Sequence, residues 1–137
     1  KICAAIKTVE TVEILDIDMG SDTNRTVVTF IAESEYVGKA AFKGIEKAAE
    51  LIDMSKHTGA HPRMGATDVC PFIPVSNVSM EDCIDIAKKL GNNVGELLKI
   101  PVFLYEMAAA NEERRNLANV RSGEYEGLGE KLKDENI

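Results

Sequence analysis

The chain has 137 residues, of which 45% are hydrophobic and 28% are charged, and its formal net charge is −7. This length predicts one compact domain, and the acidic balance argues against nucleic-acid binding, which needs a basic face. Apolar runs of about six residues are far too short to span a membrane. The three cysteines show no CxxC spacing, which indicates free thiols and a cytoplasmic protein.

The first half of the chain predicts a helix, two strands and a second helix. Residues 1–8 have the apolar spacing of a short amphipathic helix. Residues 11–18 and 25–33 are rich in β-branched side chains and predict two strands, and the short turn between them favours an antiparallel pair. Residues 34–54 carry a stripe of small and aliphatic side chains, which predicts a long helix capped by Ser34.

The second half predicts two more strands around another helix. Residues 68–75 indicate a buried strand that a proline makes irregular. Residues 79–98 predict a helix, with Ser79 as its cap and Asp82 in the capping-box position. Residues 100–107 predict a last strand, and the charged tail predicts short helical pieces.

These elements, in the order α-β-β-α-β-α-β, indicate an α+β or α/β fold with a single sheet covered by helices. A strand ahead of the first helix would complete a ferredoxin-like split β-α-β arrangement. We therefore expect a ferredoxin-like subdomain that lacks its first strand.

The connection over residues 55–66, SKHTGAHPRMGA, is the first candidate site. It is long for a link in a compact domain, and such loops are often functional. The proline after His61 restricts that residue to extended angles, so a proton-transfer group would stand on a stiff backbone. Arg63 and Lys56 would suit an acidic small molecule, and Gly65 permits close approach of a ligand. A plain connection with polar surface side chains stays an equal alternative.

Asp16 and Asp18 form the second candidate. They lie two residues apart on a predicted strand, so both carboxylates point to one face and could hold a cation such as a protonated amidine. The stronger alternative is that Asp18 and Asn24 are turn formers that bond their own backbone.

Other chemistries have weaker signals. The spacing of His57 and His61 resembles a metal pair, but that geometry needs a helix, which the intervening glycine and the following proline forbid. We therefore expect no metal. Cys70 is close in sequence to both histidines, but it falls in a predicted buried strand, where thiols are usually inert.

Several blocks together point to one family. GAHPRMGATDVCPFIPV, LIDMSKH, DTNRTVVTF, IPVFLYE and RSGEYEGLGEKL closely resemble the N-terminal half of the formiminotransferase family, over nearly the whole chain. The resemblance implies transfer of a formimino group from N-formimino-L-glutamate to tetrahydrofolate, which is a co-substrate, without a metal. It also implies two similar α/β subdomains with the substrates between them, and His61 as the catalytic acid and base.

The resemblance gives further expectations. Lys56 and Arg63 are expected to meet substrate carboxylates, with Gly65 beside them. Asp18, Asn24 and Arg25 are expected to line the facing wall.

Residues 1–137 are expected to be the N-terminal subdomain of a longer transferase, weakly active or inactive alone. The C-terminal subdomain of the same transferase and a second copy in a homodimer are the expected protein partners. The alternatives are a non-catalytic module for folate binding or dimerisation, or transfer of a formyl group instead.

Overall fold

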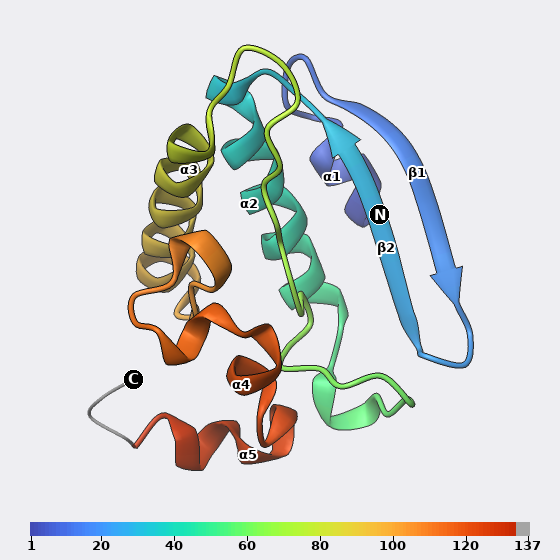
Figure 1. Ribbon diagram of the computed structural model, residues 1–137. Helices are drawn as coiled ribbons and strands as arrows, with labels where there is room; N and C mark the ends of the chain where they lie inside the picture. Colours follow the sequence, from blue (N-terminus) through green and yellow to red (C-terminus); the bar gives the residue numbers. More distant parts are fainter. Residues whose placement is uncertain (134–137) are drawn as a thin grey trace.

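The computed structural model describes residues 1–133 (Figure 1). A short helix, α1 (Ile2–Ile6), leads into strands β1 (Glu13–Gly20) and β2 (Arg25–Ile31). The two strands pair antiparallel, from Glu13 opposite Ile31 to Gly20 opposite Arg25, with an irregularity between Ile14 and Asp16. The short polar turn between two β-branched runs thus forms the hairpin that the sequence predicts.

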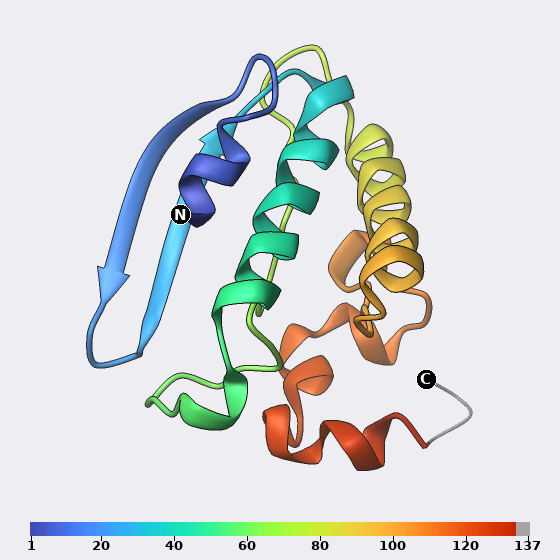
Figure 2. The same ribbon diagram turned by 180° about the vertical axis from the view of Figure 1, so that it is seen from behind.

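Helix α2 (Ser34–Leu51) follows β2 and covers the same face of the hairpin as α1 (Figure 2). One core cluster lies between them: buried Ile6, Val9 and Ala40, with Ile14, Val28 and Phe30 of the strands packed against it. The predicted cap is wrong by one residue, because Glu33 holds the N-cap position and Ser34 begins the helix.

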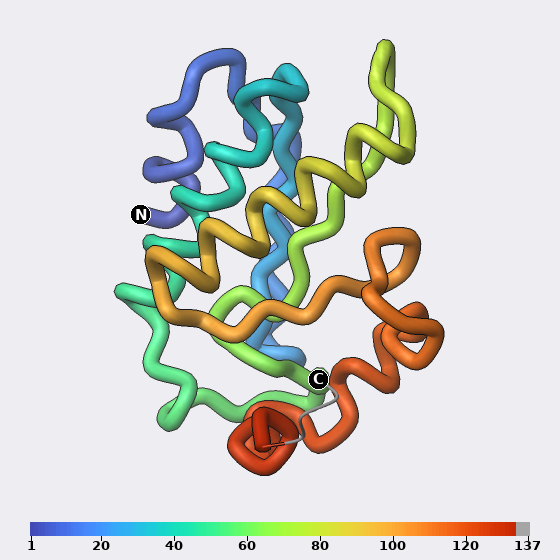
Figure 3. The backbone as a smooth tube through the Cα atoms, turned by 90° about the vertical axis from the view of Figure 1, so that its left-hand side faces the viewer, coloured from blue at the N-terminus to red at the C-terminus, as the bar shows by residue number. Residues whose placement is uncertain are grey.

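Helix α3 (Met80–Asn93) packs beside α2 and continues as one wide turn, η2 (Val94–Leu98) (Figure 3). Its start is as predicted: the Ser79 hydroxyl accepts from the Asp82 amide, and the Asp82 carboxylate accepts from the Ser79 amide. A second core cluster joins these helices, with Ala41, Leu90 and Val94 at its centre and Phe30 shared with the first cluster.

The strands predicted at 68–75 and 100–107 are wrong. Neither segment is a strand of the sheet, which within residues 1–133 consists of β1 and β2, and the second segment ends in a single helical turn. Cys70 and Phe72 still pack on the second cluster, so the apolar period-2 pattern reports burial of one face. Pro71, Pro74 and Pro101 cannot donate to a ladder, which removes part of the gain from pairing.

The C-terminal part forms the short helical pieces that its sequence predicts. The single turns η3 (Glu106–Ala108) and η4 (Glu113–Arg115) precede the helices α4 (Leu117–Arg121) and α5 (Glu124–Lys131). In Figure 1, α5 lies at the same end of the molecule as the β1–β2 turn and the single turn η1 (Met54–Lys56) that follows α2.

The chain is therefore a small α+β domain, as predicted, with helices against one face of a two-stranded antiparallel sheet. None of the helices between residues 1 and 133 is both long and apolar enough to cross a membrane.

Candidate active site

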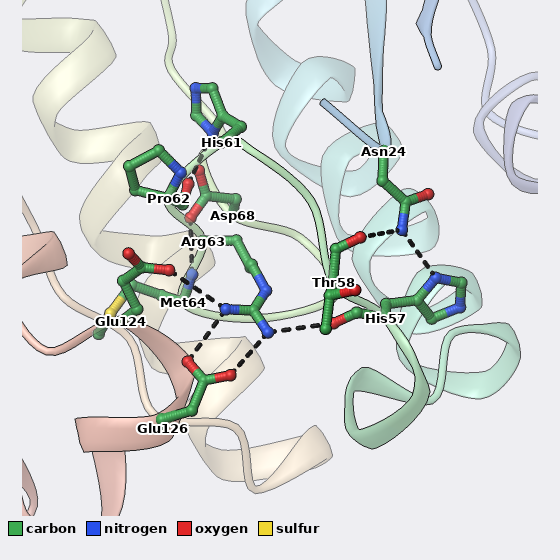
Figure 4. A network of polar contacts seen from close by, with 10 residues as sticks. All are labelled: Asn24, His57, Thr58, His61, Pro62, Arg63, Met64, Asp68, Glu124 and Glu126. Atoms are coloured by element: carbon green, nitrogen blue, oxygen red, sulfur yellow. Dashed lines mark hydrogen bonds and ion pairs between the residues drawn. The ribbon is translucent and has the colours of Figure 1, made fainter. Parts of the chain in front are cut away.

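The loop after η1 lies against the β1–β2 turn. Asn24 stands at the turn with a left-handed backbone, φ 48°, which asparagine tolerates better than most residues. Its side-chain amide donates to the Thr58 carbonyl at 2.8 Å and meets Nδ1 of His57 at 3.3 Å (Figure 4). Because an amide nitrogen only donates, Nδ1 of His57 accepts and the His57 proton lies on Nε2.

Gly59 is required by this contact. A Cβ built on Gly59 would lie 2.6 Å from the Thr23 carbonyl oxygen and 3.0 Å from Cβ of Asn24. The Ala60 amide also reaches the Asp22 carbonyl at 3.5 Å. The glycine therefore allows the loop to approach the protein's own hairpin.

His61 has a defined tautomer. Arg25 Nη1 lies 2.6 Å from Nε2 of His61, and arginine has only donors, so Nε2 is the acceptor. The ring proton is then on Nδ1, which donates to the Pro62 carbonyl at 2.6 Å. His61 is half-buried, and its imidazole is thus held from both nitrogens on a non-helical backbone.

Arg63 ties the loop to α5. Its two terminal nitrogens lie 3.0 and 2.8 Å from the two carboxylate oxygens of Glu126, and Nη1 also reaches Glu124 at 3.2 Å (Figure 4). Nη2 donates to the His57 carbonyl at 3.0 Å. The bond from Arg63 lowers the pKa of Glu126, and that carboxylate raises the pKa of Arg63.

A second ion pair, of opposite sense, links Asp68, shortly after the loop, to α4. Asp68 accepts from the Met64 amide at 2.8 Å and pairs with Arg121 of α4. Both side chains are largely shielded, with 13% of Asp68 and 18% of Arg121 exposed. Arg63 therefore pairs with two carboxylates of α5, and Asp68 pairs with an arginine of α4.

Lys56 lies at the start of the loop. Its side chain is 78% exposed, far more than that of Arg63. It pairs with Asp53 at 2.8 Å, and this bond, with those from Ser55, lowers the pKa of Asp53. An ion pair so open to water contributes little to stability and can exchange for another anion.

Asp18 lies on the face of the sheet that the helices leave free. Val28 and Phe30 pack toward the helices, so alternation turns their neighbours Val27 and Thr29 the other way. Asp18 faces Val27 across the hairpin and Asp16 faces Thr29, which puts both carboxylates on that free face, as predicted. Within the described residues, Asp18 makes no side-chain hydrogen bond, so the structure does not join it to His61.

Gly65 stands in open surroundings. The nearest atom to a Cβ built there is the Thr67 carbonyl oxygen, at 3.9 Å, so no protein contact requires glycine. Its role in admitting a ligand stays a prediction.

Two open hollows flank the pair formed by Arg63 and Glu126. The first has a volume of about 460 Å³ and is lined by Thr58, Gly59, Arg63, Gly123, Glu124 and Glu126. The second, of about 520 Å³, extends along α5 and includes His57, Tyr125 and Leu128 in its lining. His61 lines neither hollow, so these spaces are not by themselves the reaction site.

No group of three or more His, Cys, Asp or Glu side chains that could hold a metal ion is found within residues 1–133. Burial raises the pKa of the Cys70 thiol to about 11, so at neutral pH this group is protonated and a poor nucleophile. His61 is accordingly a better candidate than Cys70 for the reacting side chain of this region.

The sequence comparisons decide the family. A model of the formiminotransferase domain, N-terminal subdomain, matches residues 1–137. The chain belongs to the formiminotransferase family. Glutamate formimidoyltransferase from Streptococcus pyogenes serotype M1 is 43% identical over 134 residues, which are 98% of this chain and 45% of that protein.

Longer relatives also match the chain. Formimidoyltransferase-cyclodeaminase from Dictyostelium discoideum is 48% identical over 134 residues, 98% of this chain and 25% of its own length. The Mus musculus protein of the same name is 54% identical over 120 residues, 88% of this chain and 22% of its own length. This formiminotransferase chain thus spans less than half the length of these relatives.

Sequence reasoning about this formiminotransferase chain missed the acidic partners of Arg63. Glu124 and Glu126 lie 61 and 63 residues further along the chain, and no local spacing predicts a pairing over that range. The tail sequence GEYEG offered only a signal of charge, two glutamates at the start of a helical piece. Asp68 and Arg121 were missed for the same reason.

Proposed function

We propose that this chain is the N-terminal subdomain of a transferase that moves the formimino group of N-formimino-L-glutamate to tetrahydrofolate, with His61 as the general acid and base. The support is the family match together with the names of the relatives, two of which, from Streptococcus pyogenes and Thermoplasma acidophilum, are glutamate formimidoyltransferases. The observation that carries the role of His61 is its tautomer, which leaves the Nε2 lone pair as the proton acceptor.

The chemistry needs one group that both takes and gives a proton. N5 of tetrahydrofolate attacks the formimino carbon and forms a tetrahedral intermediate. N5 then loses a proton to Nε2 of His61, and the same nitrogen returns a proton to the departing glutamate amine as its bond to carbon breaks. A single histidine can perform both transfers in turn, and such positioned transfer contributes on the order of 10²–10⁴ in rate.

The substrate carboxylates are proposed to meet Lys56 and Arg63, with the open space at Gly65 admitting the ligand. For Arg63 the substrate carboxylate must replace Glu126, because both terminal nitrogens of the guanidinium already bond the Glu126 carboxylate. Asn24 holds the loop against the hairpin, and Asp18 on the free face of the sheet is proposed to meet the cationic formimino group.

The proposal extends to the whole protein. A C-terminal subdomain is proposed to complete the folate site, in a homodimeric cytoplasmic enzyme that uses tetrahydrofolate as co-substrate and no metal. Relatives of which this chain covers 22–45% support a further domain. Formyl transfer, or a non-catalytic folate-binding or dimerisation role, is the alternative.

The deciding experiment measures formimino transfer to tetrahydrofolate by the full-length protein with His61→Gln and, as the matched loop variant, His57→Gln. His61→Gln is expected to lower turnover by at least about 10²-fold with KM values little changed. The His57 variant is expected to lose far less. Full turnover in His61→Gln would refute the role of His61. Formyl transfer without formimino transfer would refute the assigned substrate, and folate binding without either reaction would favour the binding module.

A further inference from the structure

Arg25 differs from the other cations of the loop and hairpin. Lys56 is paired with Asp53, and Arg63 is paired with Glu124 and Glu126. Within residues 1–133, Arg25 makes no ion pair, and the side-chain partner of its guanidinium is the neutral ring of His61. Of these three side chains, Arg25 is therefore the one that an incoming carboxylate can reach without displacing another carboxylate.

The contact from Arg25 is made to Nε2 of His61, the nitrogen that is proposed to transfer the proton. Nδ1 of His61 is occupied as the donor to the Pro62 carbonyl, so Nε2 carries the only free lone pair of the ring. Arg25 Nη1 donates into this lone pair at 2.6 Å. As long as that bond persists, Nε2 cannot receive a proton from a substrate.

The alternative partner is the stronger one. A guanidinium can form two parallel hydrogen bonds with a carboxylate and is attracted to its negative charge, whereas the ring of His61 accepts one bond from Arg25. Arg25 is exposed at the first position of β2, so its long side chain can turn without disturbing the core. Its strand position, opposite Gly20, lies two residues from Val27 and hence on the same free face of the sheet as Asp18.

We propose that Arg25 is a positioning residue that caps Nε2 of His61 in the free protein and releases it when a substrate carboxylate takes the guanidinium. The inference rests on the proposed role of His61 as proton-transfer group. The hydrogen bond from Arg25 to Nε2 breaks, an ion pair from Arg25 to the carboxylate forms, and no proton moves in this step. Binding of an anionic substrate thus exposes the base, which is capped in its absence.

The test reads the ring nitrogens directly, by NMR of the full-length protein labelled with ¹⁵N-histidine. His57→Asn and His61→Asn assign the two ring signals of this segment, which are expected to report opposite tautomers, with the proton on Nε2 in His57 and on Nδ1 in His61. The probes are glutarate, a dicarboxylate without an amidine, and glutaramide, its neutral analogue. Glutarate is expected to shift the Nε2 signal of His61, and glutaramide is expected to leave it unchanged.

Variants distinguish the proposed release of Nε2 by Arg25 from a general effect of added salt. Arg25→Met is expected to show an uncapped Nε2 signal without ligand and no further response to glutarate, whereas Arg115→Met, which removes an exposed arginine of η4, behaves as the parent protein. Arg25→Lys, which keeps the charge but not the fork, is expected to respond only partly. In the transfer assay, Arg25→Met is expected to raise KM for N-formimino-L-glutamate by about tenfold or more.

The proposal is overturned if glutarate leaves the His61 signal of the parent protein unchanged, a result that needs no variant to fold. It is also overturned if Arg25→Met responds to glutarate as the parent does. These outcomes are independent of turnover. Full activity of His61→Gln would instead remove the proposed function and leave the NMR result standing as a binding event.

Discussion

At the scale of single residues, the site depends on the absence of a side chain at Gly59. Adding a methyl group would place Cβ 2.6 Å from a backbone oxygen of the hairpin, where a real Cβ is essentially never found. Either the loop or the turn would have to move. Gly59 is therefore a structural requirement of the loop that presents His61.

We predict that Gly59→Ala lowers the free energy of unfolding by about 1–3 kcal/mol, the usual cost of an added methyl group in a tight contact. Formimino transfer is expected to fall further than stability explains, because the loop carries His61. Gly95→Ala is the matched control, since a Cβ there meets nothing within 4 Å. Chemical denaturation and the transfer assay measure the two effects. Equal stability of the two variants would contradict the predicted clash.

Cys70 allows a prediction from its pKa. Burial raises this value to about 11, so the folded protein holds the thiol protonated and the thiolate forms only as the pH approaches 11. At pH 8 alkylation by iodoacetamide is expected to be about two orders of magnitude slower than for an ordinary thiol of pKa about 8.5. The rate should keep rising about tenfold per pH unit up to pH 10. A rate that levels off near pH 9 would show an accessible, ordinary thiol.

At the residue scale, the backbone conformation around His61 could be predicted from the sequence. Pro62 and the glycines excluded a helix around His61, and the loop is indeed non-helical. The partners of each polar group were not accessible, because they come from segments up to 63 residues away. Gly59 also illustrates the limit, because the group that approaches it closely is the hairpin, and no local pattern predicts that contact.

At the scale of elements, α5 acts on the loop through Glu126. Arg63 lowers the pKa of the Glu126 carboxyl, so the ion pair stabilises the folded state above the ordinary pKa of a glutamate, about 4.5. That contribution is lost as the pH falls through the lowered value. The docking of α5 should therefore weaken only in acid.

We predict that Glu126→Gln speeds hydrogen exchange of the α5 amides severalfold at pH 7, because it removes the charge that holds the Arg63 fork. The control is Glu130→Gln on the same helix, whose carboxylate pairs, among residues 1–133, with exposed Lys133 alone. Hydrogen exchange followed by mass spectrometry compares them. The difference between the variants should shrink as the pH is lowered below the ordinary glutamate pKa of 4.5, and a difference that stays constant would mean that Glu126 acts through packing.

The elements themselves were predicted unevenly. Helix α3 was predictable because a capping box is a local signal, and Ser79 and Asp82 form it. The segments 68–75 and 100–107 were not, because alternation reports which face is buried and not whether a neighbouring strand is present. A ladder depends on another part of the chain, which a local pattern does not contain.

At the scale of the whole molecule, the sheet has an edge with apolar surroundings. Figures 1 and 2 show β2 between β1 and the extended segment 68–75, and within residues 1–133 no strand pairs with β2 on that side. Ile73 and Val75 are 75% and 76% exposed. An open edge beside exposed aliphatic side chains is the arrangement that another strand would cover.

The proposal that residues 1–137 form one subdomain of a longer transferase predicts that the rest of that protein supplies this strand. In the full-length protein, the β2 amides that β1 does not bond should exchange with solvent at least about tenfold more slowly than in the 137-residue chain. The outer amides of β1, on the far edge, are the internal control and should exchange alike in both. Such protection would mean that the hairpin carrying Asn24 and Arg25 is held in register by the added strand, which links completion of the sheet to the position of His61. Equal exchange at β2 would leave the two-stranded sheet as the complete one and would remove the ferredoxin-like arrangement.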